Sequence, residues 1–597
     1  MSRLSILCHA VLLLFPLLLI SAPQNISKDD IEAVEARPLD SIPSGALVIV
    51  QIKGIEGTLN SLNEFVKNAV PDAMPLSENF IVNGSLEFLR GRKLNGLAPN
   101  GPHFFAVMEL PKPNQAPNPN KVLAAIKVTN YNAFREGVLK DSEIKSIKLE
   151  KNAEVVTMEN GSTLFFIPKK GQVLVTPDRE IANLVAKRPF PVTTKISRIQ
   201  SERLQEPDLG IFVNLEAIHK DYPHSLAETK KEMESQLSDL ESFFGTGKFF
   251  GGDLVRQAIK LAFKGIEDSK GMVFSIDFKP TGIAFHGETE FKANTQTAAF
   301  FKGSKPDEMM DLQRLPAGKT LYMAQQTQSP AIKSLASFFM GLAPEENQKE
   351  LAGDFQMFLQ LANNRYDALS FPPEGLQIIH SANPEETKIR FFNLLQKLGQ
   401  GAKFQNAILK SNPIIKKAAE SLSGQTFDLV SFEWDLEKMT KLLVRDTKGN
   451  QFWNKIQKLM IKKMMGDKMN LWITTSKNEV ILATGEDWGK SKKIFEDFHN
   501  NMKNLEKISH YPIHRKDLPK KCSLIILFDP LYYLKFILTT VKELENVPAT
   551  LDLTGYSNTF IGFSTVFEED RAAIDSVISA ASIQEIYFRL IKQVIGK

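Results

Sequence analysis

The sequence predicts an α+β protein of two related lobes, each with a mixed or mainly antiparallel sheet and helices packed on one face. Its length of 597 residues exceeds the roughly 250–300 residues at which a single hydrophobic core stops growing. Apolar residues make up 43% of the chain and charged residues 24%, which is usual for a folded globular protein. Strand-like segments alternate with amphipathic helical ones, and many connections are too short for parallel crossovers.

The N-terminus has the pattern of a secretory signal peptide over residues 1–22, followed by a linker over residues 23–39. Arg3 gives the start a positive charge, residues 10–20 are uninterrupted apolar (AVLLLFPLLLI), and the small residues Ser21 and Ala22 follow. The apolar run is short for a membrane span, and an N-terminal membrane anchor is the alternative interpretation. We therefore expect an exported protein.

The cysteine count favours a bacterial envelope, either periplasmic or extracellular. The chain has 2 cysteines, Cys8 and Cys522, and removal of the leader leaves a single thiol that cannot form an internal disulfide. Large secreted eukaryotic proteins usually carry disulfides. Beyond the leader, the most apolar stretch, residues 531–541, is interrupted by Lys535. We therefore expect no transmembrane helix in the mature chain.

The charge balance excludes nucleic acid as an expected partner. The chain has 73 Lys and Arg residues against 69 Asp and Glu residues, a net charge of +4. Nucleic-acid-binding proteins concentrate a much larger positive excess.

An internal duplication is predicted from motifs that recur in one order. Residues 42–45 (IPSG) and 315–318 (LPAG) each lead from a proline and a glycine into a strand. A strand ending in Asn214 corresponds to one ending in Asp529, and both residue types cap helices. The predicted lobes span residues 40–303 and 313–597, with a polar boundary between them.

Further elements follow the same order in both lobes. The first lobe has a strand that ends at Asn130, and a hairpin followed by a helix capped by Thr176. The second repeats them at Asn383 and Thr484. Helices are also predicted over residues 225–243, 254–266, 414–422 and 583–595.

The phrase Leu315-Pro316-Ala317-Gly318, repeated strand–Asn/Asp–helix units and a leader together resemble uncharacterised secreted bacterial proteins. Those proteins have strand–helix repeats that open on a leucine-proline-alanine phrase. The resemblance implies the fold and an envelope location. It implies no activity, cofactor or functional residue.

Two glycine-containing motifs fail a spacing check against nucleotide-binding loops. Gly318-Lys319-Thr320 lacks the glycine that a phosphate-binding loop needs at position 313, and it precedes a strand instead of following one. The glycines of residues 245–251 lack the third glycine of a dinucleotide fingerprint. We expect neither a nucleotide nor another cofactor.

Two clusters of polar residues are candidate chemical sites. His510 and His514 have the spacing of zinc ligands on a helix, with Cys522 further on, but Pro512 predicts a loop and hence no metal site. His286, Glu288 and Glu290 alternate along one strand and share a face. They suit acid–base chemistry, or they face solvent from a strand whose Ile283, Phe285 and Phe291 lie in the core. We assign no catalytic residue.

The candidate ligand-binding residues lie on one amphipathic helix, predicted within residues 452–465. Trp453, Ile456, Met460 and Met464 fall on one side at helical spacing, with lysines elsewhere. Such a helix contacts an apolar ligand or an anionic membrane surface, or it packs on its own sheet with its lysines pointing outward.

The function expected from the sequence is non-catalytic binding in the bacterial envelope, with an apolar ligand as the sharper form. The alternative is a secreted hydrolase, because active-site residues converge in space and need not form a sequence motif.

Overall fold

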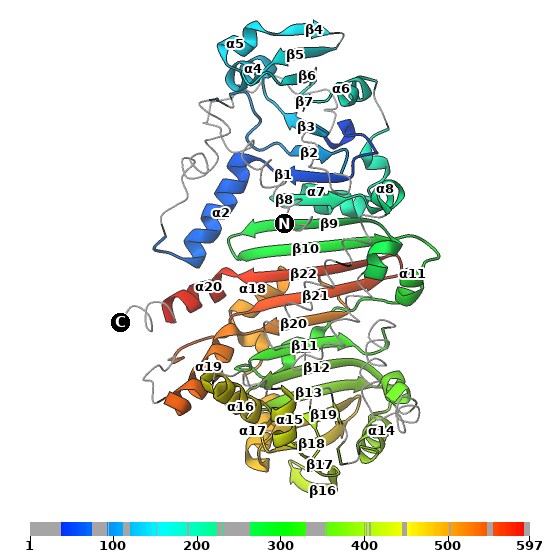
Figure 1. The fold of residues 1–597 in the computed structure, drawn as a ribbon. Helices are drawn as coiled ribbons and strands as arrows, with labels where there is room; N and C mark the ends of the chain where they lie inside the picture. The colour runs from blue at the N-terminus through cyan, green and yellow to red at the C-terminus, as the bar shows by residue number, and fades with distance from the viewer. Residues whose placement is uncertain are drawn as a thin grey trace. The chain divides into compact units, whose positions relative to one another are not determined.

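The fold is described from a computed structural model of the chain (Figure 1). The described residues up to position 231, together with Gly265–Lys292, form a first compact unit, and residues 263–264 with those from Ala293 onward form a second. The boundary predicted from the sequence lies later, at residues 303–313. The structure describes residues 38–73, 92–93, 95–110, 120–150, 152–187, 190–223, 231, 263–329, 353, 355–398, 400–401, 403–404, 407–443, 451–500, 503–545 and 553–589. The predicted signal peptide lies outside these residues.

The first unit is built on an antiparallel sheet with the strand order β4-β5-β6-β7-β3-β2-β1-β8-β9-β10. The α+β class is thus confirmed, and every described strand pair is antiparallel. The strands are β1 (Val48–Ile52), β2 (His103–Val107), β3 (Val122–Lys127), β4 (Lys148–Glu150), β5 (Ala153–Thr157), β6 (Thr163–Lys169), β7 (Gln172–Thr176), β8 (Leu209–Val213), β9 (Ser269–Lys279) and β10 (Gly282–Phe291).

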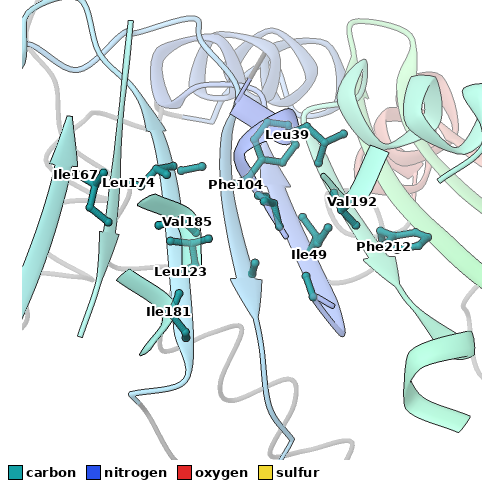
Figure 2. Packing of buried hydrophobic residues seen from close by; sticks show 14 of the residues in the cluster. Leu39, Ile49, Phe104, Leu123, Ile167, Leu174, Ile181, Val185, Val192 and Phe212 are labelled. Atoms are coloured by element: carbon teal, nitrogen blue, oxygen red, sulfur yellow. The ribbon is translucent and has the colours of Figure 1, made fainter. Parts of the chain in front are cut away.

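Helices lie on both faces of this sheet, whereas one covered face was expected. Ile49 of β1 packs in a buried cluster with residues of α6 (Arg179–Ala186) and α7 (Arg198–Gln205), part of which Figure 2 shows. Its neighbour Val50 packs in a second cluster with residues of α2 (Ile55–Ala69) and α4 (Tyr131–Val138). Because successive side chains of a strand point to opposite faces, the sheet is a central layer between helices.

Side-chain caps begin several helices of the first unit. Asn130 Oδ1 accepts a hydrogen bond from the Ala133 N–H, and Asn214 Oδ1 accepts one from Ala217, so both predicted asparagine caps are confirmed. The predicted Thr176 cap is wrong. Asp178 caps α6, and the Thr176 hydroxyl instead accepts a hydrogen bond from the Asp178 N–H. Threonine and aspartate side chains can both cap a helix. Asp178 is the cap because it directly precedes the first residue of α6, whereas Thr176 lies two residues earlier.

The second unit has the strand order β16-β17-β18-β19-β13-β12-β11-β20-β21-β22, again antiparallel throughout the described pairs. Its principal helices are α14 (Pro384–Gln396), α16 (Gln451–Met465), α17 (Trp488–His499), α18 (His510–Lys516), α19 (Pro530–Glu545) and α20 (Ala580–Ile586). The strands are β11 (Leu321–Gln326), β12 (Ala362–Ser370), β13 (Glu374–Ser381), β16 (Ile414–Leu422), β17 (Gln425–Glu433), β18 (Lys468–Ser476), β19 (Glu479–Gly485), β20 (Leu524–Phe528), β21 (Ile561–Glu568) and β22 (Arg571–Ser579).

The predicted helix over residues 414–422 is wrong, because this segment is the strand β16. It pairs with β17 in an antiparallel hairpin, with Ile414 opposite Ser431. Pairing with a neighbouring strand has overridden the local helical pattern. The predicted helix at 583–595 overlaps α20, and most of those at 225–243 and 254–266 lie outside the described residues.

The strands of the two sheets can be matched in chain order, from β1 with β11 to β10 with β22. The matched strands then occupy the same positions in their sheets. Hydrogen bonds between backbone groups repeat at the matched places. The Asn214 N–H donates to the Leu47 carbonyl in the first unit, and the Asp529 N–H donates to the Thr320 carbonyl in the second. Origin of the halves by duplication stays a prediction. Within the part of the chain that the structure describes, no helix has the length and apolarity to cross a membrane.

Candidate functional site

The predicted ligand-binding residues lie on α16, which packs against α19. Ile456 is buried, while Met460 and Met464 are half-buried. The side chain of Trp453 lies outside the described part of the structure. Lys463 donates a hydrogen bond to Glu543 of α19. The stripe therefore lies on a helix that has a neighbour in the fold, and its binding role stays a prediction.

The segment of His510 and His514 is the helix α18, so the predicted loop is wrong. His514 and Cys522 are buried, and burial lowers the pKa of His514 to about 4 and raises the pKa of Cys522 to about 11. Both groups are therefore neutral near pH 7. No three His, Cys, Asp or Glu residues among the described ones are placed to hold a metal ion.

Two groups of titratable side chains in the second unit have structural roles. His380 Nε2 lies 3.1 Å from Asp311 Oδ2 and 3.4 Å from Glu479 Oε1, and hydrogen bonds to these carboxylates raise its pKa to about 9. Burial raises the pKa of Asp529 to about 6. Asp529 accepts hydrogen bonds from the N–H groups of Leu531 and Tyr532 and so caps α19.

The strand with His286, Glu288 and Glu290 is β10, and the structure corrects part of the interpretation of its faces. Phe291 is buried as expected, beyond a register shift between Glu290 and Phe291. Glu288 is only 2% exposed and forms an ion pair with Arg203 of α7, at 3.3 Å between Arg203 Nε and Glu288 Oε2. Glu290 pairs with Lys270 at 2.9 Å. Phe285, expected in the core, is 38% exposed. The carboxylate face is thus the face that α7 covers.

A surface of apolar residues lies on the other side of β9 and β10. Phe274 of β9 is 44% exposed, and Phe285 of β10 lies opposite Ile276 of β9. Phe274 itself lies opposite Gly287, which has no side chain to cover the ring. We call this surface the β9–β10 apolar face, and it consists of Met272, Phe274, Ile276, Phe278, Ile283 and Phe285.

Two helices pack at opposite ends of the β9–β10 apolar face. At one end, Asn68 of α2 donates a hydrogen bond to the carbonyl of Pro280, at 2.9 Å. At the other, Ile218 of α8 (Leu215–Asp221) packs against Val213, which lies opposite Met272. Phe274 lies along the strand between these two contacts. Among the described residues, α2 and α8 therefore bound the apolar face at its ends and leave Phe274 exposed between them.

The buried side of the same strands is more polar than the open one. Ser275 and Glu288 are buried there, on the side of the sheet on which Gln200 of α7 donates a hydrogen bond to the Gly271 carbonyl, at 3.1 Å. Phe274 and Phe285 are exposed on one face of these strands, and Glu288 is buried on the other. In most sheets the apolar side chains are buried and the charged ones face solvent. The alternation was visible in the sequence, but it did not reveal which face α7 covers.

No family model matches the chain, and no curated protein matches it. Among solved structures, crystal form III of TP0453 is similar at 10% identity and a TM-score of 0.23, over 48% of this chain and 97% of that one. Crystal form IV of TP0453 is similar at 12% identity and a TM-score of 0.15, over 48% of this chain and 98% of that one. These similarities are too slight to assign a fold or a function.

Proposed function

We propose that this chain is an exported, non-catalytic protein that binds an apolar ligand on the β9–β10 apolar face. The observation that carries the proposal is the exposure of Phe274 and Phe285, 44% and 38%, on strands that bury Glu288. Exposed apolar surface of this kind marks binding sites in soluble proteins. Fully burying an exposed phenylalanine contributes about 1.5–3 kcal/mol. Covering the part of Phe274 or Phe285 that is still exposed contributes less than half of this, which favours an apolar occupant.

The size and chemistry of the face favour a small molecule over a protein. Its side chains carry no charged group, so the contacting part of the ligand is an uncharged hydrocarbon chain or ring. A stable protein–protein interface needs roughly 20–30 residues on each side, far more than the β9–β10 apolar face supplies. The position of this site differs from the α16 stripe expected from the sequence.

The proposal is tested with the neutral fluorescent probe N-phenyl-1-naphthylamine and the variant Phe285→Asn. We expect the variant to bind the probe about three- to sevenfold more weakly, because it removes the apolar contact of a side chain that is 38% exposed. Its unfolding midpoint should stay close to that of the wild type, because substitutions of exposed residues change stability little.

The matched control is Phe190→Asn, which removes a phenylalanine that is 81% exposed elsewhere in the first unit. This variant should bind the probe as the wild type does. Equal binding by the Phe285→Asn variant and the wild type would overturn the proposed site.

A further inference from the structure

The sheet of the first unit ends at the strand β4, which is the uppermost strand in Figure 1. β4 pairs with β5, and no second partner lies beside it among the described strands. All 3 of its residues are exposed, and the side chain of Leu149 is 80% exposed. The edge of a sheet presents backbone groups that can pair with another strand, so β4 is a candidate interaction surface.

The backbone of Leu149 points away from β5, which follows from the hydrogen bonds of the next hairpin. At its turn, the Met158 N–H donates to the Ser162 carbonyl, at 2.8 Å. Hydrogen-bonded pairs alternate with non-hydrogen-bonded ones along an antiparallel ladder. Glu154, on the same ladder, therefore bonds to Phe166 of β6 and not to β4. Because Leu149 lies opposite Glu154, its own N–H and carbonyl face the open edge.

A side-chain contact on the β4 side agrees with this orientation. The hydroxyl of Ser146, just before β4, accepts a hydrogen bond from the Thr157 N–H, at 3.0 Å. The backbone of Thr157 thus faces β4, and so does that of every second residue along β5, namely Val155 and Ala153. Glu154 lies between these two residues in the chain, and its backbone faces β6.

The side chains of β4 are complementary to those of a second copy of the same strand. Two copies that meet at this edge through a two-fold axis run antiparallel. The outward backbone of Leu149 then pairs with Leu149 of the second copy, which places Lys148 opposite Glu150 of that copy. Opposite charges directly across two strands stabilise the pair. Side chains also approach most closely at the non-hydrogen-bonded positions, which Lys148 and Glu150 would occupy.

Both charged side chains are available for such a contact. Lys148 is exposed. Glu150 pairs with Arg179 of α6, at 2.7 Å, and its side chain remains 44% exposed. A short, charged edge strand normally prevents sheets from joining. In β4, however, the two charges have opposite signs and flank the central residue, so a second copy matches them, whereas an unrelated strand has no such match.

We propose that the open edge of β4 is a self-association surface, at which two copies of this chain join by antiparallel pairing of residues 148–150. Each Leu149 N–H donates to the Leu149 carbonyl of the other copy, and Lys148 of each copy pairs with Glu150 of the other. The strand has 3 residues, far fewer than the roughly 20–30 per side of a stable interface, so the association is weak and reversible. It does not involve the β9–β10 apolar face and goes beyond the proposed function.

Sedimentation equilibrium of the full-length protein measures the association, and two charge-reversing variants test its register. Lys148→Glu and Glu150→Lys each place like charges opposite one another when the variant pairs with itself. We expect each to associate at least about threefold more weakly than the wild type. An equimolar mixture of the two variants restores opposite charges at both positions. The mixture should form a mixed dimer with a Kd close to that of the wild type.

Leu149→Pro tests the backbone pairing. Proline removes the N–H group that the second copy needs, and an edge strand tolerates proline where this group faces solvent. We expect the variant to stay monomeric, with an unfolding midpoint close to that of the wild type. The control Phe190→Asn removes an apolar residue of matching exposure, 81% against 80% for Leu149, and should associate as the wild type does.

Each contrary outcome counts against a definite part of the proposal. A wild type that is monomeric at concentrations up to about 1 mM would overturn it, as would association of a folded Leu149→Pro variant. Unfolding of that variant would show that the Leu149 N–H is bonded within the sheet, which would remove the open edge. Failure of the two charge variants to associate when mixed would overturn the antiparallel register. The binding of the apolar probe is independent of all these results.

Discussion

At the scale of single residues, burial shifts the pKa values of two histidines of this protein. His103 and His514 are buried, and burial lowers the pKa of each to about 4. A histidine in an unfolded chain has a pKa near 6.5, so folding favours the neutral ring. The stability that depends on the neutral rings is present above pH 6.5 and is lost as the pH falls from 6.5 towards 4.

His514→Leu tests this pH dependence in the second unit. Between pH 7.5 and pH 4.5, wild-type stability should fall by roughly 2 kcal/mol more than that of the variant, because leucine takes up no proton. Asp529 acts in the opposite sense, since its raised pKa of about 6 gives stability at low pH that is lost as the pH rises. This contribution of Asp529 is the same in the wild type and in the His514→Leu variant, so it does not affect the difference between them. Chemical denaturation at the two pH values provides the measurement, and parallel pH profiles would contradict the prediction.

At the scale of elements, local rules predicted the starts of helices better than they predicted the type of element. Asn130 and Asn214 cap helices as expected, because the cap needs only residues three positions apart. Residues 414–422 form β16, because the partner strand β17 decided their conformation. The helix α18 forms although Pro512 lies within it, since a proline is tolerated in the first turn.

For the helix α16, the structure leads to a definite expectation. Ile456 is buried at 4% exposure, so Ile456→Asp should unfold the second unit, because an unpaired buried charge costs several kcal/mol. Loss of the cooperative thermal transition of that unit, followed by circular dichroism, is the measurement. Lys455→Asp, an exposed change on the same helix, is the control and should leave the transition in place. A folded Ile456→Asp variant would indicate that the stripe faces an open space.

For the whole molecule, export remains the central expectation from the N-terminal sequence. We expect the mature chain from its native host to begin between about residues 22 and 28, where the leader pattern ends. Mass spectrometry of the protein from the envelope fraction measures this. An intact Met1 in that fraction would show that the apolar segment is retained as an anchor.

The sequence by itself determined the α+β class and the alternation of side chains along β9 and β10. The tertiary structure alone decided which face of those strands is covered. Alternation defines two faces but does not distinguish the buried one from the open one. That choice belongs to α7, whose Arg203 pairs with Glu288 and whose position depends on contacts between residues far apart in the chain. The candidate site was therefore assigned to α16 from sequence and to Phe274 and Phe285 from structure.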